Sequence, residues 1–389
     1  MPKRARAVRW GVPVAAIAVV AGAVGAGPVI AAVQGDPVLP ELTAQQLLAD
    51  VGTRWQSGKL PPMSGTIIET ASLGVPGLSS LAGEANTPLG LLAGSHQVKI
   101  WYGSESQVRI ALPGHMSEHD LIVNGSQTWW WDSAANTATR IKTPVAPAAP
   151  TLPPSVITPQ QAAEQALAAA DGDTAISVGN DATVAGRAAY ELVITPTTPA
   201  SLIKDIRVAI DGETLIPLRV QVYAKGAAEP AFEVGFDSVT FSRPAPENFA
   251  FTPPPGAKVE EGELPALSEK TAARIDHTAG EQAKVIGSGW STVVVMPLPE
   301  GGLTEGALTE GALTEGGLTG GEGERGMGAG AQLSAVVDGV FKAATPVSGT
   351  WGSGRLIKTK LVSVLLTDDG RVVAGAVTPE VLYEAAGRK

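Results

Sequence analysis

Residues 97–131 read QVKIWYGSESQVRIALPGHMSEHDLIVNGSQTWWW, and this stretch decides the fold class. Aliphatic residues alternate with other residues over 97–102 and again over 107–112. In a β-strand a period of two places every second side chain on the same face, so Trp101 and Arg109 lie opposite the Val and Ile of their strands. The stretch therefore predicts consecutive antiparallel strands that share one apolar face.

Turn-forming pairs separate further strand segments. Asn124-Gly125 lies between Leu121–Val123 and Gln127–Trp131, and Asn-Gly supplies the positive φ angles of a tight hairpin. Asp211-Gly212 and Asp369-Gly370 stand between later apolar segments in the same way. We expect a hairpin at each pair and a mainly β chain.

Helices are fewer. Thr43 is followed by Gln46, a capping box in which each side chain bonds the backbone amide of the other. Thr158 precedes Pro159, which suits the first position of a helix because its missing N–H has no partner there. Further helices are predicted after Ser268, over residues 333–341 and after Thr378.

The N-terminus carries an export signal. Residues 1–33 begin with four basic side chains and continue from Gly11 without any charge. This pattern is typical of a secretory signal peptide, and the apolar run is also long enough to serve as an uncleaved membrane anchor. We therefore expect an extracytoplasmic protein, either secreted or anchored to the outer face of the cytoplasmic membrane.

The composition of the chain after the export signal indicates its domain division and the partners that it can bind. Residues 36–256 are predicted as one domain and residues 257–389 as a C-terminal α/β extension, with a disordered Gly-rich repeat loop at 297–331. Residues 144–154 form a Pro/Ala linker within the first domain. The chain has 28 Lys and Arg against 38 Asp and Glu, so it repels nucleic acid. It has no cysteine, so burial rather than disulfides must stabilise the fold.

Two short motifs resemble catalytic or cofactor patterns without the required context. His115-Met-Ser-Glu-His119 matches H-x-x-E-H, a zinc pattern that needs both imidazoles on one face of a helix, whereas a strand is predicted here. Residues 321–326 match G-x-G-x-x-G but lie in the repeat loop instead of between a strand and a helix. We expect no metal, no cofactor and no enzymatic activity.

The run Trp129-Trp130-Trp131 leaves two interpretations open. Alternation puts Trp129 and Trp131 on one face of a strand and Trp130 on the other. Either the rings fill the core and cover a sheet edge, or one face lines an apolar cavity. The second interpretation assigns six cleft-lining residues, which are Trp129, Trp131, Leu121, Val123, Trp101 and Arg109.

The order of these segments resembles the LolA/LppX/RseB superfamily over about residues 36–256. The resemblance rests on order and pattern, carried by Ser64–Ile67, Arg109-Ile110, the 121–129 hairpin with Asp132, residues 211–222, Phe232–Val239 and the Phe249-Ala-Phe-Thr-Pro-Pro-Pro255 tail. It implies an incomplete antiparallel β-barrel, or curved sheet, with helices across its concave face. Members bind acyl chains or lipoproteins in that cleft, or act as envelope stress sensors.

Two functions follow from this resemblance. The first is a carrier that binds a lipid, acyl chain or lipoprotein, and the second is an extracytoplasmic regulator that binds a membrane-embedded anti-sigma factor. The high Ala and Gly content is typical of actinobacterial proteins. Acyl chains that co-purify with the protein would favour the carrier, and a captured membrane regulator would favour the second function.

The export prediction can be tested with a fusion. Residues 1–35 joined to a reporter that is active only outside the cytoplasm should give activity, because the basic start and apolar run suffice for translocation. An expressed fusion that stays inactive in the cytoplasm contradicts the assignment. The size of the mature protein separates cleavage from anchoring.

Overall fold

The computed structural model of the chain describes residues 37, 39–56, 60–74, 93–114, 116–141, 158–170, 172–262, 283–297 and 344–388. The predicted export segment, the linker at 144–154, the repeat loop and the helices expected after Ser268 and over 333–341 lie outside the described residues. Within those residues, no helix has both the length and the apolar composition needed to cross a membrane.

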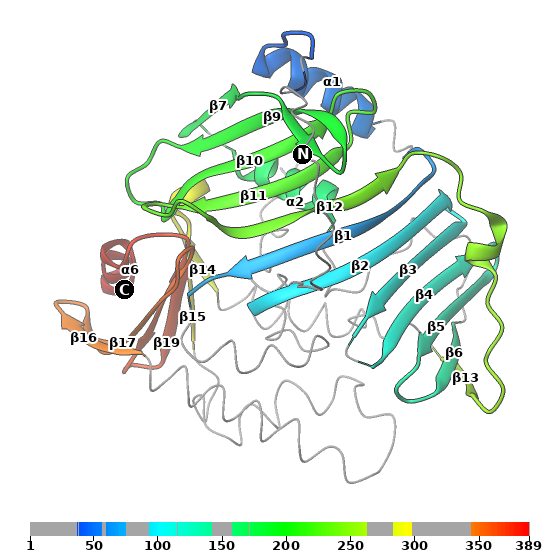
Figure 1. Cartoon of the computed structure of the whole chain (residues 1–389). Helices are drawn as coiled ribbons and strands as arrows, with labels where there is room; N and C mark the ends of the chain where they lie inside the picture. The colour runs from blue at the N-terminus through cyan, green and yellow to red at the C-terminus, as the bar shows by residue number, and fades with distance from the viewer. Residues whose placement is uncertain are drawn as a thin grey trace, which may run out of the picture.

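The first thirteen strands of the described chain form one large open sheet (Figure 1). Its strand order is β13-β6-β5-β4-β3-β2-β1-β12-β11-β10-β9-β7, with β8 paired to β9. The strands are β1 (Met63–Ser72), β2 (Ala93–Ser104), β3 (Gln107–Pro113), β4 (Glu118–Asn124), β5 (Gln127–Asp132), β6 (Thr137–Ile141), β7 (Thr174–Val178), β8 (Ala182–Val184), β9 (Arg187–Pro196), β10 (Ile203–Asp211), β11 (Pro217–Ala224), β12 (Pro230–Thr240) and β13 (Lys258–Gly262).

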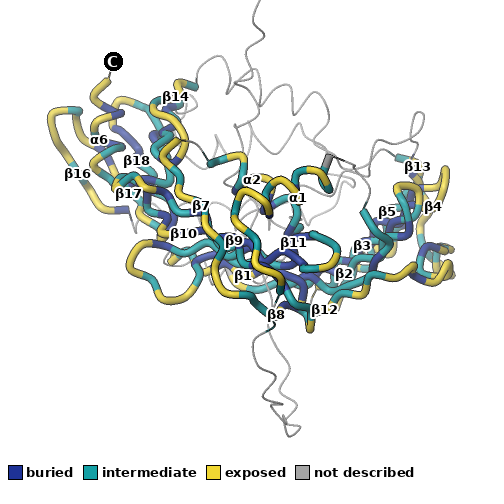
Figure 2. The backbone as a smooth tube through the Cα atoms, turned by 90° about the horizontal axis from the view of Figure 1, so that it is seen from above, coloured by how far each residue is buried: buried dark blue, intermediate teal, exposed yellow. Residues whose placement is uncertain are grey.

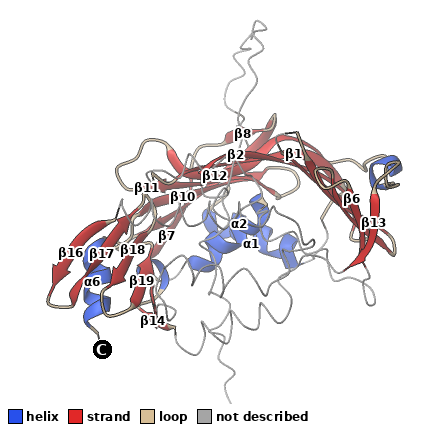
Figure 3. Ribbon diagram, turned by 90° about the horizontal axis from the view of Figure 1, so that it is seen from below, coloured by secondary structure: helices blue, strands red, loops and turns tan. Residues whose placement is uncertain are grey.

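The sheet is arched, and its two edges do not meet. β13 and β7 stand at opposite ends of the strand order, while α1 (Ala44–Gln56) and α2 (Pro159–Ala169) lie inside the arch (Figures 2 and 3). This confirms the predicted curved, mainly β sheet with helices across its concave face. One pair of strands in this sheet is parallel. After β12 the chain crosses back to the far edge, where β13 pairs in parallel with β6.

Both helices begin as their sequences predict. The backbone amide of Gln46 donates to the Thr43 hydroxyl at 3.2 Å, and the Thr43 amide donates to the Gln46 side chain at 2.9 Å. The second helix has the same reciprocal cap between Thr158 and Gln161, with Pro159 in its first turn. Their apolar faces join the core of the large sheet, where α2 packs on β11 and β12 and α1 packs on β7.

The first predicted hairpin turns one residue later than expected. Asn124 still pairs with Gln127, so the two turn residues are Gly125 and Ser126. Of these, only Gly125 has a positive φ, 62°. Glycine at the first central position suits a type II′ turn, whereas Asn-Gly at both central positions would form type I′.

The turns predicted at the two Asp-Gly sequences have different outcomes. Asp369-Gly370 forms the predicted hairpin, with Gly370 at φ 83° and Thr367 paired with Arg371. The tight turn predicted at Asp211-Gly212 is wrong, because β11 starts only at Pro217. A longer loop forms instead, and the Asp211 carboxylate organises it by accepting the backbone amides of residues 213 and 214 at 3.2 and 2.7 Å.

A second sheet of six strands follows in the C-terminal part, in the order β14-β15-β19-β18-β17-β16. Its elements are β14 (Lys284–Ile286), β15 (Val293–Pro297), β16 (Thr345–Gly349), β17 (Gly352–Lys358), β18 (Ser363–Thr367), β19 (Arg371–Gly375) and the helix α6 (Pro379–Gly387). The strand expected over 289–296 begins only at Val293, because Gly289–Ser291 form the 3-10 turn η4 that turns Trp290 into the core of the large sheet.

The two sheets are joined by several contacts. The indole N–H of Trp290 donates to the Thr174 hydroxyl at 2.7 Å. Backbone hydrogen bonds link Leu202 to Ala376 at 2.9 Å and Thr378 to Ala200 at 2.8 Å. The large sheet also continues through β13 to Gly262, beyond the boundary predicted at residue 256. The domain division itself stays a prediction.

The Asp211 carboxylate provides a test of stability against pH. Burial raises its pKa, but hydrogen bonds from Arg187 and Thr214 outweigh burial and hold the pKa below its ordinary value. A carboxylate whose pKa is lower in the folded state stabilises the fold at pH values above its unfolded-state pKa of about 4. This contribution is lost as the pH falls through the folded-state pKa. Asp211→Asn should lower the free energy of unfolding by about 3 kcal/mol at pH 7 and flatten its dependence on pH below about 5.

Urea denaturation at pH 7 and pH 4 checks this expectation. Glu213→Gln is the matched control, because Glu213 contacts the same Arg187 at 2.9 Å but its side chain is 82% exposed. It should change the free energy by less than about 1 kcal/mol. An Asp211→Asn variant as stable as the control contradicts the assignment.

Candidate functional site

The pairing of β1 to β6 assigns their side chains to two faces. Leu121 lies opposite Ile110 on β3 and Trp130 on β5, whereas Ile122 lies opposite Trp129. Directly opposed residues of antiparallel strands share a face. The Leu121 row packs into the core that contains α1 and α2, so it faces the concave side, and the Ile122 row faces the convex side.

The concave face of β1 to β6 is an apolar wall. Its aliphatic and aromatic members are Met63, Ile67, Val98, Ile100, Tyr102, Val108, Ile110, Leu112, Leu121, Val123, Trp130 and Ile141. Ile100, Tyr102, Leu112 and Trp130 are only half-buried. The main contacts of the described helices lie on β7, β11 and β12, so this wall extends well beyond them.

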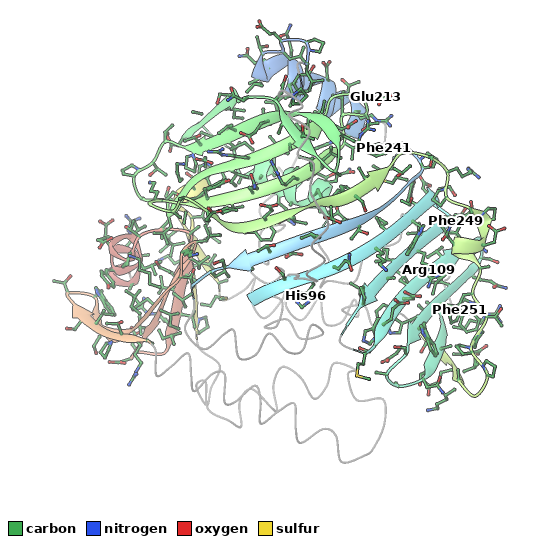
Figure 4. All side chains as sticks on the ribbon, in the orientation of Figure 1. His96, Arg109, Glu213, Phe241, Phe249 and Phe251 are labelled. Atoms are coloured by element: carbon green, nitrogen blue, oxygen red, sulfur yellow. The ribbon has the colours of Figure 1, made fainter. Side chains whose placement is uncertain are left out.

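A crossover segment, residues 241–257 between β12 and β13, packs over the convex face (Figure 4). Its 3-10 turn η3 (Pro246–Phe249) lies on β3 and β4, and Phe249 is almost completely buried. The ring of Phe251 lies 5.6 Å from that of Trp129 and 6.0 Å from that of Trp131. The two tryptophans therefore form the surface on which this segment packs.

Charged groups are interleaved with the convex tryptophans. The Arg109 guanidinium lies 5.5 Å above the Trp101 ring and forms an ion pair with the buried Asp120. Arg140 lies 5.9 Å above the Trp129 ring. Burial and the neighbouring Glu118 raise the pKa of Asp120 above its ordinary value, although Arg109 opposes the shift. These contacts are cation–π and ionic, unlike those of a wall for an acyl chain.

The six residues predicted to line one cleft are therefore divided between two faces. Leu121 and Val123 are buried in the concave wall, but Trp129, Trp131, Trp101 and Arg109 lie on the convex face. The expectation that they share a face is wrong, because the pairing of β4 with β5 places Leu121 opposite Trp130 instead of between Trp129 and Trp131. Whether any of them binds a ligand stays a prediction.

Alternation separates Trp130 from Trp129 and Trp131 as predicted, but Trp130 is the member of the run that faces the concave side. Its ring stacks on that of His119 with the centroids 5.7 Å apart, and the His119 Nδ1 lies 3.8 Å from the Asp132 carboxylate. The signal was present in the sequence. The apolar residues Leu121 and Val123 mark the core face of β4, and the two-residue turn fixes which tryptophan opposes them.

The zinc pattern is not assembled. Glu118 and His119 are neighbours on β4, so their side chains point to opposite faces, and His115 lies outside the described residues. Among the residues that the structure describes, no three His, Cys, Asp or Glu side chains come together in a geometry that could hold a metal ion.

Comparisons with known proteins find similarity only among solved structures. No protein-family model matches the chain, and the curated proteins contain no match. A structure of the MucA/MucB complex from Pseudomonas aeruginosa matches at 13% identity, over 87% of this chain and 96% of the other, with a TM-score of 0.37. LprF from Mycobacterium bovis matches at 10% identity, over 55% of this chain and 97% of the other, with a TM-score of 0.27.

A LolA superfamily protein from Nitrosomonas europaea also matches, at 10% identity, over 54% of this chain and 99% of the other, with a TM-score of 0.20. Proteins of the kind named by the sequence resemblance are thus among the structural neighbours. All three TM-scores lie below 0.5.

The packing of the crossover segment can be tested at Phe251. Phe251→Ala should lower the free energy of unfolding by about 1–2 kcal/mol, because it removes a half-buried ring from two tryptophans. The near-ultraviolet circular dichroism of the tryptophans should weaken at the same time. Unchanged stability together with impaired binding of an acyl probe would contradict this structural role and assign the convex tryptophans to a ligand site.

Proposed function

We propose that this chain is an extracytoplasmic protein that holds an acyl chain, free or attached to a lipoprotein, against the concave wall of β1 to β6. The observation that carries the proposal is the continuous apolar face of these strands, which extends past the two described helices. An ordinary antiparallel sheet buries one face and leaves the other polar. Here the apolar face continues along strands on which the described helices make few contacts.

The dimensions of the wall suit a hydrocarbon chain. Six strands at a spacing of about 4.8 Å give a width of about 24 Å. One acyl chain spans about 15 Å, half of a bilayer core. Burial of an acyl chain against aliphatic and aromatic side chains is favourable by roughly 0.8 kcal/mol per methylene group. The half-buried Ile100, Tyr102, Leu112 and Trp130 are the side chains we assign to this contact.

The export segment supports the location of this function. A protein that leaves the cytoplasm through residues 1–33 meets membrane lipids and lipoproteins at the outer face of the membrane. The alternative is a regulator that uses the C-terminal sheet to bind a membrane-embedded partner. That function replaces the first if the protein carries no lipid.

Two neighbouring tryptophans give a matched test. Trp130→Ala should weaken binding of a fluorescent fatty acid about tenfold, because the ring belongs to the concave wall. Trp131→Ala should leave binding nearly unchanged, because that ring lies under the crossover segment. Far-ultraviolet circular dichroism confirms that both variants fold before titration.

Mass spectrometry of a solvent extract of the purified protein provides the second measurement. Co-extracted acyl lipids support the proposal. A protein that releases no lipid and binds no acyl probe contradicts it, as does weaker binding in the Trp131 variant alone.

A further inference from the structure

A second surface of interest lies on the opposite, convex face of β1, β2 and β12. The structure has a shallow groove of about 190 Å³ there, lined by Ser64, Gly65, Thr66, Lys99, Trp101, Ser238, Val239 and Thr240. The strand register explains why these side chains lie together. Ser64 lies opposite Thr240 and Trp101, while Thr66 lies opposite Ser238 and Lys99. Four hydroxyls, one ammonium and one indole therefore converge from three adjacent strands.

A β-bulge lies beside the groove. The pairing of β1 with β12 shifts between Thr66 and Ile67, so that Asp237 is the extra residue on β12. A bulge increases the local twist of the strands and redirects neighbouring side chains. It lies at the end of the groove formed by Thr66 and Ser238.

The polar groups of the groove are not used by the fold. In the described part of the chain, the hydroxyls of Ser64, Thr66, Ser238 and Thr240 make no hydrogen bond, and neither does the indole N–H of Trp101. The convex face over β9 to β12 behaves differently, because its polar groups pair with one another. Gln221 donates to Glu233 at 2.6 Å, for example.

The charge in the groove is also uncompensated. Lys99 makes no ion pair with any described residue, and no Asp or Glu lines the groove, although the whole chain has a net charge of −10. On the far side of the Trp101 ring, by contrast, Arg109 is paired with Asp120. An unpaired ammonium beside an aromatic ring and several hydroxyls is suited to one anionic group on a polyhydroxylated ligand.

We propose that this groove binds a saccharide unit that carries a carboxylate, such as a hexuronic acid in a glycan chain. The sugar ring packs on the half-buried Trp101 ring, its carboxylate accepts a hydrogen bond from Lys99, and its hydroxyls bond those of β1 and β12. The site is independent of acyl-chain binding, because it lies on the other face of the same strands.

Calorimetric titration of the full chain with a glucuronic-acid disaccharide tests the proposal. Lys99→Gln should weaken binding about tenfold, the loss expected for one charge-assisted hydrogen bond. Trp101→Ala should weaken it at least as much, and Thr66→Val, which keeps the side-chain shape, should weaken it by about threefold. Lys204→Gln is the matched control, because this lysine lies on β10 and pairs with Asp205 at 3.2 Å.

Three outcomes overturn the proposal. The first is absence of binding to the wild-type protein. The second is equal binding of a neutral disaccharide, which removes the role of the carboxylate. The third is binding that Lys99→Gln and Thr66→Val leave unchanged. Thermal unfolding of each variant, Trp101→Ala above all, distinguishes lost binding from lost structure.

Discussion

One long-range strand pairing holds the large sheet together, the antiparallel ladder between β1 and β12. It joins β2 to β6, which follow β1 along the chain, to β7 to β11, which precede β12. The buried pair Ile67 and Phe236 lies at the centre of this ladder. Because the ladder joins the two halves edge to edge, their apolar faces form a single concave surface, and the helices on one half share a core with the other half.

The two faces of this sheet carry different kinds of side chain. On the concave side, rows of aliphatic and aromatic residues continue from the helices across β2 to β6. On the convex side, arginines lie beside the tryptophans, and the crossover segment covers β3 to β5 with Phe249 and Phe251. The run Trp129-Trp130-Trp131 therefore contributes side chains to both faces of the sheet. Its outer members pack beneath the crossover segment, and its central member stacks on His119 in the concave wall.

The crossover segment also explains the one parallel pair of strands. After β12 the chain returns to the far edge of the sheet, where Lys258 pairs with Thr137. The C-terminal sheet attaches near the opposite half, through Trp290 on Thr174 and the backbone bonds of residues 200–202. Trp290 and Leu361 lie in the core of the large sheet, so the C-terminal part is joined to it by burial as well as by hydrogen bonds.

The sequence by itself determined the local features of this protein. Alternation over 97–112 produced the strands, the capping boxes at Thr43 and Thr158 produced the helix starts, and Asp369-Gly370 produced its hairpin, because each depends on neighbouring residues. Alternation and the two-residue turn after Asn124 put Trp130 on the face of Leu121 and Val123, and only the tertiary structure decided that this face is the concave one on which the helices lie. Tertiary contacts also replaced the tight turn at Asp211 with a loop, because the carboxylate binds Arg187 as well as the loop amides. The groove beside Trp101 also depends on tertiary contacts. Its residues come from β1, β2 and β12, and only strand pairing brings those distant segments together.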